Sequence, residues 1–292
     1  MRAREADVGD VRLVAMMMET FSQVWAGRLG GGPQSDSPLA KDREAEERFS
    51  TTRRPMPLGQ AWTYAQTLGQ VAHDHEQILR EALQRSANHE GARPVSTIDT
   101  LTRVIVELLA RQVWLTDPAL TTEERFGRML ALERDAVKSE WRITNPGEAH
   151  EVNPSLAALE TDAERCDLVL PRVPEKTQLA GALFERASLY VPEATITSRI
   201  GEMMYRLLSG AIHGDVAHLL GVLLPTGEFN GEKAVFTYSL SASMLWRAAA
   251  CFFLATFAAR STYADWLGID VPDETKRLSL HHIRLSTRRL GT

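Results

Sequence analysis

Residues 244–259 read Met-Leu-Trp-Arg-Ala-Ala-Ala-Cys-Phe-Phe-Leu-Ala-Thr-Phe-Ala-Ala and form the most apolar run in the chain. The run is about four residues shorter than a bilayer span requires, and Arg247 lies within it. We therefore expect a buried helix over residues 241–264, at the centre of a protein core rather than in a membrane.

Most of the remaining chain also has helical periodicity, with apolar residues at steps of three and four. The predicted helices cover residues 8–26, 58–88, 98–115, 123–143, 154–166, 174–189, 200–224 and 241–264, with a last helix from Asp273 onward. Residues 234–240 alternate weakly and predict one short extended segment, and no βαβ alternation or repeat is present. The sequence therefore predicts an all-α multi-helix bundle with at most one short extended hairpin segment.

Helix starts and loops suggest how this bundle is divided. Ser96-x-x-Asp99 has the form of a capping box, and Thr121 or Thr122 with Glu124 predicts a second helix start. We expect residues 1–95 to form an N-terminal helical region with a mobile loop near 28–57, in which a helical turn is expected near residues 44–49. Residues 96–292 are expected to form a compact helical core. The basic helix after Asp273 is expected to be a solvated terminal helix.

The composition is that of an ordinary soluble globular protein. The 292 residues are 44% hydrophobic and 24% charged, with a net charge of −5. This balance argues against a surface that grips duplex DNA, and the charged N-terminus has no signal-peptide h-region. Two distant cysteines give no disulfide framework, so we expect a cytoplasmic protein with no membrane partner.

The segment Tyr205-Arg-Leu-Leu-Ser-Gly-Ala-Ile-His213-Gly places Arg206 and His213 seven residues apart, which is two helical turns. Ser209 lies between them on the same predicted face. The rest of the segment is apolar or small, and Gly210, Gly214, Ala217 and Gly221 form a stripe that favours close helix packing. A charged pair on such a helix indicates either a reactive site or a structural polar cluster.

A second polar stripe lies on the predicted helix 98–115, where Arg103, Glu107 and Arg111 recur every four residues. One interpretation is a solvated ladder of intrahelical ion pairs. In the other, Glu107 supplies the carboxylate that keeps Arg206 or His213 charged inside a cleft.

Familiar catalytic and cofactor motifs are absent from the sequence. It contains no His-Glu-x-x-His, paired Cys-x-x-Cys, Gly-rich phosphate loop or Gly-x-Ser-x-Gly. His73-Asp-His75 has no evident third ligand. We expect no cofactor and no metal site.

The helix around Arg206 and His213 resembles the HEPN family of all-helical nucleotide-binding domains. The resemblance is strongest to larger bacterial members with the pattern Tyr-x-x-Leu-Ser-x-x-x-His-Gly, here Tyr205, Leu208, Ser209, His213 and Gly214. Those proteins also have an earlier Arg-x-x-x-Glu helix, a Trp-Leu-x-Asp-Pro stop and an Arg-rich capped helix. The corresponding residues are Arg103, Glu107, Trp114, Leu115, Asp117, Pro118, Arg125 and Arg128.

This resemblance implies a metal-independent endoribonuclease that works as a homodimer on RNA or tRNA. His213 is then the acid/base group for attack of the 2′-OH on the adjacent phosphate, and Arg206 neutralises charge on the phosphoryl oxygens. Tyr205, Ser209, Arg103, Glu107 and Arg111 are the supporting residues.

Two other functions remain open. The same polar cluster, around Glu107, Arg111, Tyr205 and His213, is compatible with a transferase-type helical enzyme acting on a small molecule or an aminoacyl-tRNA. Alternatively, Arg206 and His213 are structural hydrogen-bonding groups in a non-catalytic interaction protein.

Overall fold

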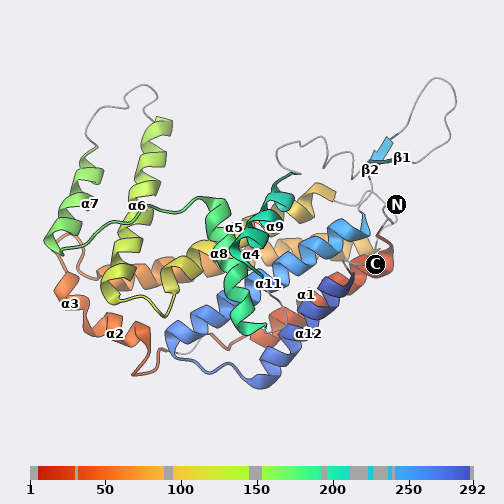
Figure 1. Cartoon of the computed structure of the whole chain (residues 1–292), viewed down its shortest axis with the longest axis horizontal. Coiled ribbons are helices and arrows are strands. Elements are labelled where there is room, and N and C mark those ends of the chain that lie inside the picture. The colour runs from red at the N-terminus through yellow and green to blue at the C-terminus, as the bar shows by residue number, and fades with distance from the viewer. Residues whose placement is uncertain are drawn as a thin grey trace.

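A computed structural model describes residues 6–29, 32–88, 95–144, 153–191, 196–210, 223–225, 236–238 and 241–289. These residues form eleven helices and two three-residue strands, which confirms the all-α prediction (Figure 1). The helices are α1 Val8–Trp25, α2 Pro38–Glu44, α3 Glu46–Phe49, α4 Pro57–Asn88, α5 Val95–Thr116, α6 Thr122–Thr144, α7 Pro154–Arg165, α8 Lys176–Tyr190, α9 Ser198–Gly210, α11 Ala242–Leu267 and α12 Asp273–Arg289.

The strands β1 Leu223–Pro225 and β2 Phe236–Tyr238 pair antiparallel, with Leu224 opposite Thr237. The expected extended segment is confirmed at β2. The predicted helix 200–224 is wrong at its end, because residues 223 and 224 are in β1. Pro225 follows them directly, and proline disfavours the helical conformation in the residue before it.

Helix α11 is the centre of the main core, as the apolar run predicted. The Ser241 side chain caps its start by accepting from the Met244 N–H at 3.2 Å, and Gly268 ends it in the left-handed conformation with φ 70°. All its residues are buried except Ser243, Arg247, Arg260 and Asp265. Among the described helices, only α11 is long and apolar enough to span a bilayer, yet 89% of its most apolar window is buried in the protein. Packing inside the fold thus accounts for its apolar character.

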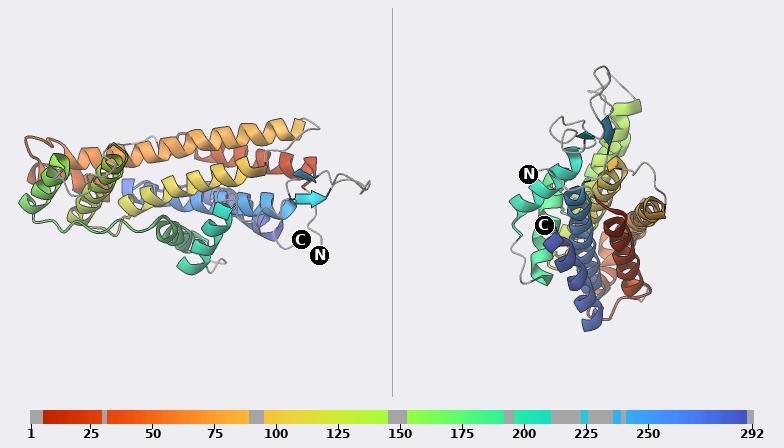
Figure 2. Two further views of the ribbon diagram at one scale, coloured as in Figure 1. Left: turned by 90° about the horizontal axis from the view of Figure 1, so that it is seen from above. Right: turned by 90° about the vertical axis from the view of Figure 1, so that its right-hand side faces the viewer.

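Helix α5 lies between α4 and α11, and the three run along the long axis of the molecule (Figure 2). Helix α1 packs on α4, and α8 and α9 pack on each other and on α5. The main core draws residues from α1 and α4 as well as from α5, α8, α9 and α11. It therefore crosses the domain boundary expected at residue 95.

The described part of region 28–57 is not the loop that was expected, because α2 forms within it beside α3, and both pack into a second core. Helix α3 lies where a helical turn was expected, near residues 44–49. Leu39 and Phe49 are each 1% exposed. Asp42 makes a two-oxygen ion pair with Arg125 of α6, at 2.6 and 2.7 Å, and Arg125 is also 1% exposed. A charge pair this deeply buried holds α2 against α6. The sequence did contain one signal for α2. Ser37 is its N-cap and Pro38 its first helical residue, and both residue types favour these positions.

The predictions for the C-terminal helix and for the start of α5 are corrected. Helix α12 is not merely solvated: it packs on α11 and α1 and buries His282 and Ile283, among others. Helix α5 begins at Val95, so Ser96 lies inside the helix and the predicted capping box there is wrong. At α6 the capping prediction is confirmed, because Thr121 and Glu124 exchange side-chain to backbone hydrogen bonds of 2.9 and 3.2 Å.

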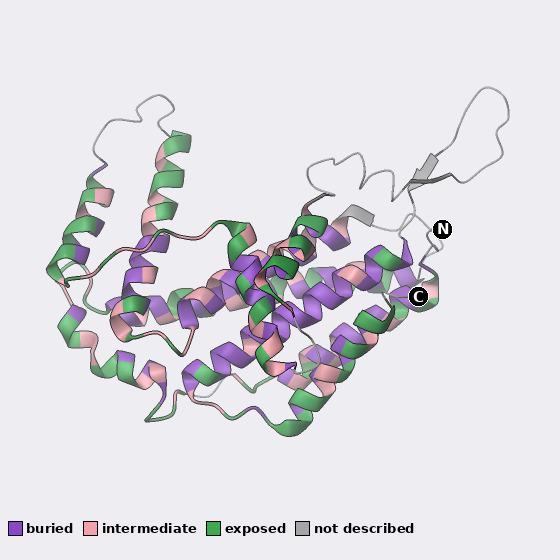
Figure 3. Ribbon diagram, in the orientation of Figure 1, coloured by how far each residue is buried: buried purple, intermediate pink, exposed green. Residues whose placement is uncertain are grey.

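Figure 3 shows how buried positions concentrate in α11, whereas the outer ends of α6 and α7 are exposed.

Candidate functional site

Tyr205 of α9 and Glu107 of α5 meet where these two helices pack together. The Tyr205 hydroxyl donates to Glu107 Oε1 at 2.5 Å, and Tyr205 is 3% exposed. Arg103 Nε donates to the same carboxylate oxygen at 2.8 Å and lies 3.2 Å from the Tyr205 hydroxyl. Lys176, at the start of α8, contacts the other carboxylate oxygen at 2.8 Å. Three helices therefore converge on one carboxylate.

The electrostatics of this cluster follow from its burial and its cations. Burial alone would raise the pKa of Glu107, but the hydrogen bonds from Lys176 and Tyr205 and the attraction of the cations outweigh it and lower the pKa below its ordinary value. Burial and the hydrogen bond to Glu107 together raise the pKa of Tyr205. The cluster is thus a charged carboxylate with a neutral phenol and two cations around it at neutral pH.

The stripe on α5 matches the two sequence interpretations in part. The ion pair between Arg103 and Glu107 is the expected i,i+4 pair. Glu107 also reaches α9, but through Tyr205, and the carboxylate that contacts Arg206 is Glu202. Arg111 is half-buried and has no ion pair or hydrogen bond with the part of the chain that is described.

Arg206 points away from this cluster into solvent. Its side chain is 69% exposed, and its ion pair with Glu202 is a loose 3.7 Å. Ser209 uses its hydroxyl within α9, donating to the Tyr205 carbonyl at 3.1 Å. Residues 211–222, which include His213 and most of the predicted glycine stripe, lie outside the described residues.

Two other glycines, Gly181 and Gly201, bring α8 and α9 together. A Cβ at Gly201 would lie 2.8 Å from the Phe184 Cβ, and one at Gly181 would lie 2.8 Å from the Ser198 carbonyl oxygen. Neither these glycines nor Lys176 were among the predicted site residues. The two glycines could have been recognised from the sequence, since each interrupts an otherwise periodic helical segment. No local pattern indicated Lys176.

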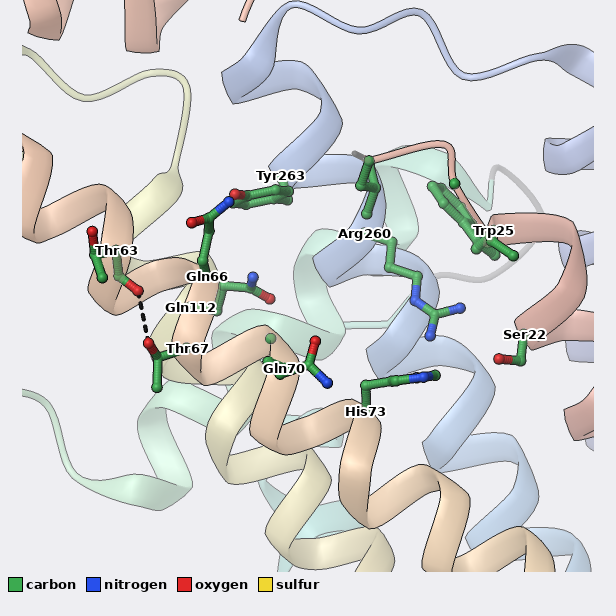
Figure 4. Close-up of a pocket in the computed structure, with 14 residues that line it drawn as sticks. Ser22, Trp25, Thr63, Gln66, Thr67, Gln70, His73, Gln112, Arg260 and Tyr263 are labelled. Carbon is green, nitrogen blue, oxygen red and sulfur yellow. Dashed lines mark hydrogen bonds between the residues drawn. The ribbon is translucent and has the colours of Figure 1, made fainter. Parts of the chain in front are cut away.

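A separate cavity of about 760 Å³ lies between α1, α4 and α11. In Figure 4, Ser22 and Trp25 line one side, His73 and Gln70 of α4 line another, and Arg260 of α11 extends between them. The other lining residues are Ala26, Gly27, Leu29, Thr63, Gln66, Thr67, Gly69, Gln112 and Tyr263. Amides and hydroxyls dominate its polar lining, which suits hydrogen bonding to an uncharged polar molecule.

Arg260 is already neutralised at the base of this cavity. Its Nη2 donates to Glu76 Oε2 at 2.8 Å, and His73 Nδ1 lies 3.4 Å from the same oxygen. Burial opposes ionisation of Glu76, but the attraction of Arg260 and the hydrogen bond from His73 leave its pKa lowered. The guanidinium is therefore committed to a structural ion pair.

Neither Glu107 nor Tyr205 lines this cavity. Within the described ranges, no group of three or more His, Cys, Asp or Glu side chains is arranged to hold a metal ion. No protein-family model, curated protein or solved structure matches this chain.

Proposed function

We propose that this protein binds RNA through the exposed face of α9 and cleaves it without a metal, with Arg206 and His213 at the scissile phosphate. The observation that supports this best is the contrast between neighbouring residues. Tyr205 is buried and hydrogen-bonded, whereas the Arg206 guanidinium is exposed and only loosely paired. A fixed helix that offers an exposed, loosely paired guanidinium to solvent suits bidentate binding of a phosphate.

The chemistry assigned to the pair rests on the family resemblance and on the side chains themselves. The 2′-oxygen attacks the adjacent phosphorus as His213 accepts the 2′-OH proton, and the bond from phosphorus to the 5′-oxygen breaks. The protonated imidazole then gives a proton to the departing 5′-oxygen, which leaves a 2′,3′-cyclic phosphate and returns His213 to its neutral form. Arg206 offsets the charge that builds on the phosphoryl oxygens.

Tyr205, Glu107 and Arg103 are positioning residues in this proposal. Their bonds join α9 to α5, and the close α8–α9 contact at Gly181 and Gly201 restrains the helix from its other side. A binding group held on a rigid element loses less entropy when its ligand arrives.

The same helix offers a surface for a second copy of the chain. Ile200, Met203 and Leu207 lie on one face of α9 and are 40%, 55% and 42% exposed. Three exposed apolar side chains in one row favour burial against a partner. Pairing of two copies through this row would bring the Arg206 residues of both toward one RNA strand, as the homodimer expectation requires.

The two alternative functions gain less from the geometry. A small-molecule enzyme built on Glu107, Arg111 and Tyr205 would need these residues in a ligand-sized cavity, and they do not line the cavities of about 760, 480 and 450 Å³ in the described part of the chain. A purely structural role for Arg206 would require burial and firm hydrogen bonds, yet its side chain is mostly exposed.

The test is RNA binding and cleavage by the purified full chain in EDTA, with labelled tRNA and single-stranded RNA. Arg206→Ala should weaken binding about tenfold, and His213→Ala should abolish cleavage while RNA still binds. Arg85→Ala on α4 is the matched control, because the Arg85 side chain is 74% exposed and also pairs with a glutamate one turn earlier, Glu81. The proposal is contradicted if neither RNA binds, if the two arginine variants lose equal affinity, or if cleavage survives in His213→Ala.

A further inference from the structure

A second cavity, of about 480 Å³, lies where α5, α6 and α8 meet. It is lined by Trp114 and Asp117 of the Trp-Leu-x-Asp-Pro segment, by Arg128 of the Arg-rich helix α6, and by Arg186 of α8. None of these residues takes part in the proposed RNA site.

Arg128 has unused hydrogen-bonding capacity in this cavity. Its Nη1 donates to the Trp114 carbonyl at 2.6 Å, and its guanidinium lies 5.0 Å from the centre of the Trp114 ring. Its other N–H groups have no hydrogen-bond or ion-pair partner among the described residues. Burial lowers the pKa of Arg128, while Asp117 and Glu124 act against that shift. A partly desolvated guanidinium without a carboxylate partner gains from an added anion.

Arg186 of α8 adds a second cation to the lining of this cavity. Its Nη1 contacts Asp117 Oδ1 at 2.9 Å, and its side chain is 18% exposed. Its Nε is buried and makes no hydrogen bond within the described part of the chain. Asp117 is therefore one carboxylate between two guanidiniums. The cavity's other carboxylate, Glu185, is exposed and contacts neither arginine.

Apart from Ser188, the rest of the cavity lining is apolar. It consists of Ala110, Val113, Leu179, Ala182, Leu183 and Leu189 beside the Trp114 ring. An apolar lining next to a cation suits a molecule with an apolar body and one charged end. The cavity volume of about 480 Å³ falls in the range of small-ligand sites. A fully hydrated anion would leave that lining in contact with water.

We propose that this cavity binds a small organic carboxylate, with its carboxylate on Arg128 and its apolar body against Trp114 and the leucines of α8. The larger cavity beside Arg260 differs, because Glu76 already neutralises its only arginine. The proposal is independent of RNA binding, since it shares no residue with the α9 site.

The test is calorimetric titration of the full chain with octanoate, benzoate and inorganic phosphate. Octanoate or benzoate should bind with a Kd of about 1 mM or tighter, and phosphate more weakly than both. Arg128→Gln should weaken carboxylate binding about tenfold, and Arg128→Lys should restore part of it. Arg134→Gln is the control, because Arg134 lies on the same helix and also donates to a carbonyl, that of Pro171, at 2.8 Å. It should change affinity by less than about twofold.

Three outcomes would overturn the assignment. The first is that neither carboxylate binds at concentrations up to about 10 mM. The second is equal loss in Arg128→Gln and Arg134→Gln, which would indicate a general effect on stability. The third is tighter binding of phosphate than of either carboxylate, which would show that the cavity prefers a small hydrated anion to an anion with an apolar body. Circular dichroism of each variant confirms that it is folded before titration.

Discussion

Tyr205 and Glu107 are 98 residues apart in the sequence, yet a 2.5 Å hydrogen bond joins them across the contact between α9 and α5. This bond fixes which face of α9 is buried. Because Tyr205 points inward, its neighbour Arg206 points into solvent. The orientation of the proposed phosphate-binding group thus depends on a bond made by the adjacent residue.

Removing the charge of Glu107 should destabilise the contact between α5, α8 and α9. Glu107→Gln weakens its bonds to Arg103, Lys176 and Tyr205 and should lower the free energy of unfolding by about 1–3 kcal/mol at pH 7. Urea denaturation measures this loss. Glu160→Gln on α7 is the control, since Glu160 is exposed; an equal loss there would show that the cluster contributes nothing specific.

The stability difference should also depend on pH. The pKa of Glu107 is lowered in the folded state, so its carboxylate contributes stability above the ordinary value of 4.5. That contribution is lost as the pH falls through the lowered folded value. The gap between wild type and Glu107→Gln should therefore be full at pH 7 and shrink below pH 4.5. A gap that stays constant over this range would contradict the lowered pKa.

The buried pair between Asp42 and Arg125 should matter far more than an exposed pair. Asp42→Ala leaves the Arg125 guanidinium buried without its carboxylate, which should cost about 3–5 kcal/mol of unfolding free energy. Glu123→Ala breaks the exposed pair with Arg48, whose side chain is 66% exposed, and should cost less than about 1 kcal/mol. Thermal denaturation of both variants measures the difference, and similar losses would show that the Asp42 pair is not buried in solution.

The close contact between α8 and α9 should not tolerate a methyl group. Gly201→Ala places a Cβ against the Phe184 Cβ and the Gly181 backbone and should destabilise the fold by about 1–3 kcal/mol. Gly59→Ala is the matched helix control, because the nearest atom to its Cβ would be at 3.4 Å. There the better helix propensity of alanine should leave stability unchanged or raised. Equal effects at the two positions would contradict the close crossing.

The apolar row on α9 predicts a dimer that one charge disrupts. Met203→Glu should shift the full chain from dimer to monomer in sedimentation velocity, because it places a carboxylate in the proposed interface. Ile78→Glu is the control, since Ile78 is 53% exposed on α4, away from that row. A monomeric wild type, or a dimer that Met203→Glu leaves intact, would contradict pairing through α9.

Helix positions could be predicted well from local patterns. The apolar run around residues 244–259 identified α11, and the Thr121–Glu124 capping box identified the start of α6, because both signals lie within a few residues of the feature they specify. The helix α2 was missed, since its stability comes from long-range contacts such as that between Asp42 and Arg125. Proline and charged residues around it are locally typical of a loop.

The site was predictable in part for the same reason. The four-residue spacing of Arg103 and Glu107 predicted their ion pair, because both residues are on one helix. No local sequence pattern predicted the residues that reach Glu107 from other helices. Tyr205, rather than Arg206, turned out to contact Glu107, and Lys176 joined from α8. Which face of α9 turns inward depends on how α5, α8 and α9 pack together.

The most direct test of the central claim is analysis of the RNA ends produced in EDTA. A short single-stranded RNA, or tRNA, is incubated with wild type, Arg206→Ala, His213→Ala and the Arg85→Ala control, beside the same RNA with a 2′-deoxynucleotide at the cleavage position. We predict 2′,3′-cyclic phosphate ends from wild type and Arg85→Ala, and none from the other two variants or from the deoxy substrate. Uncut RNA with wild type, or cleavage of the deoxy substrate at the same position, would contradict the proposal.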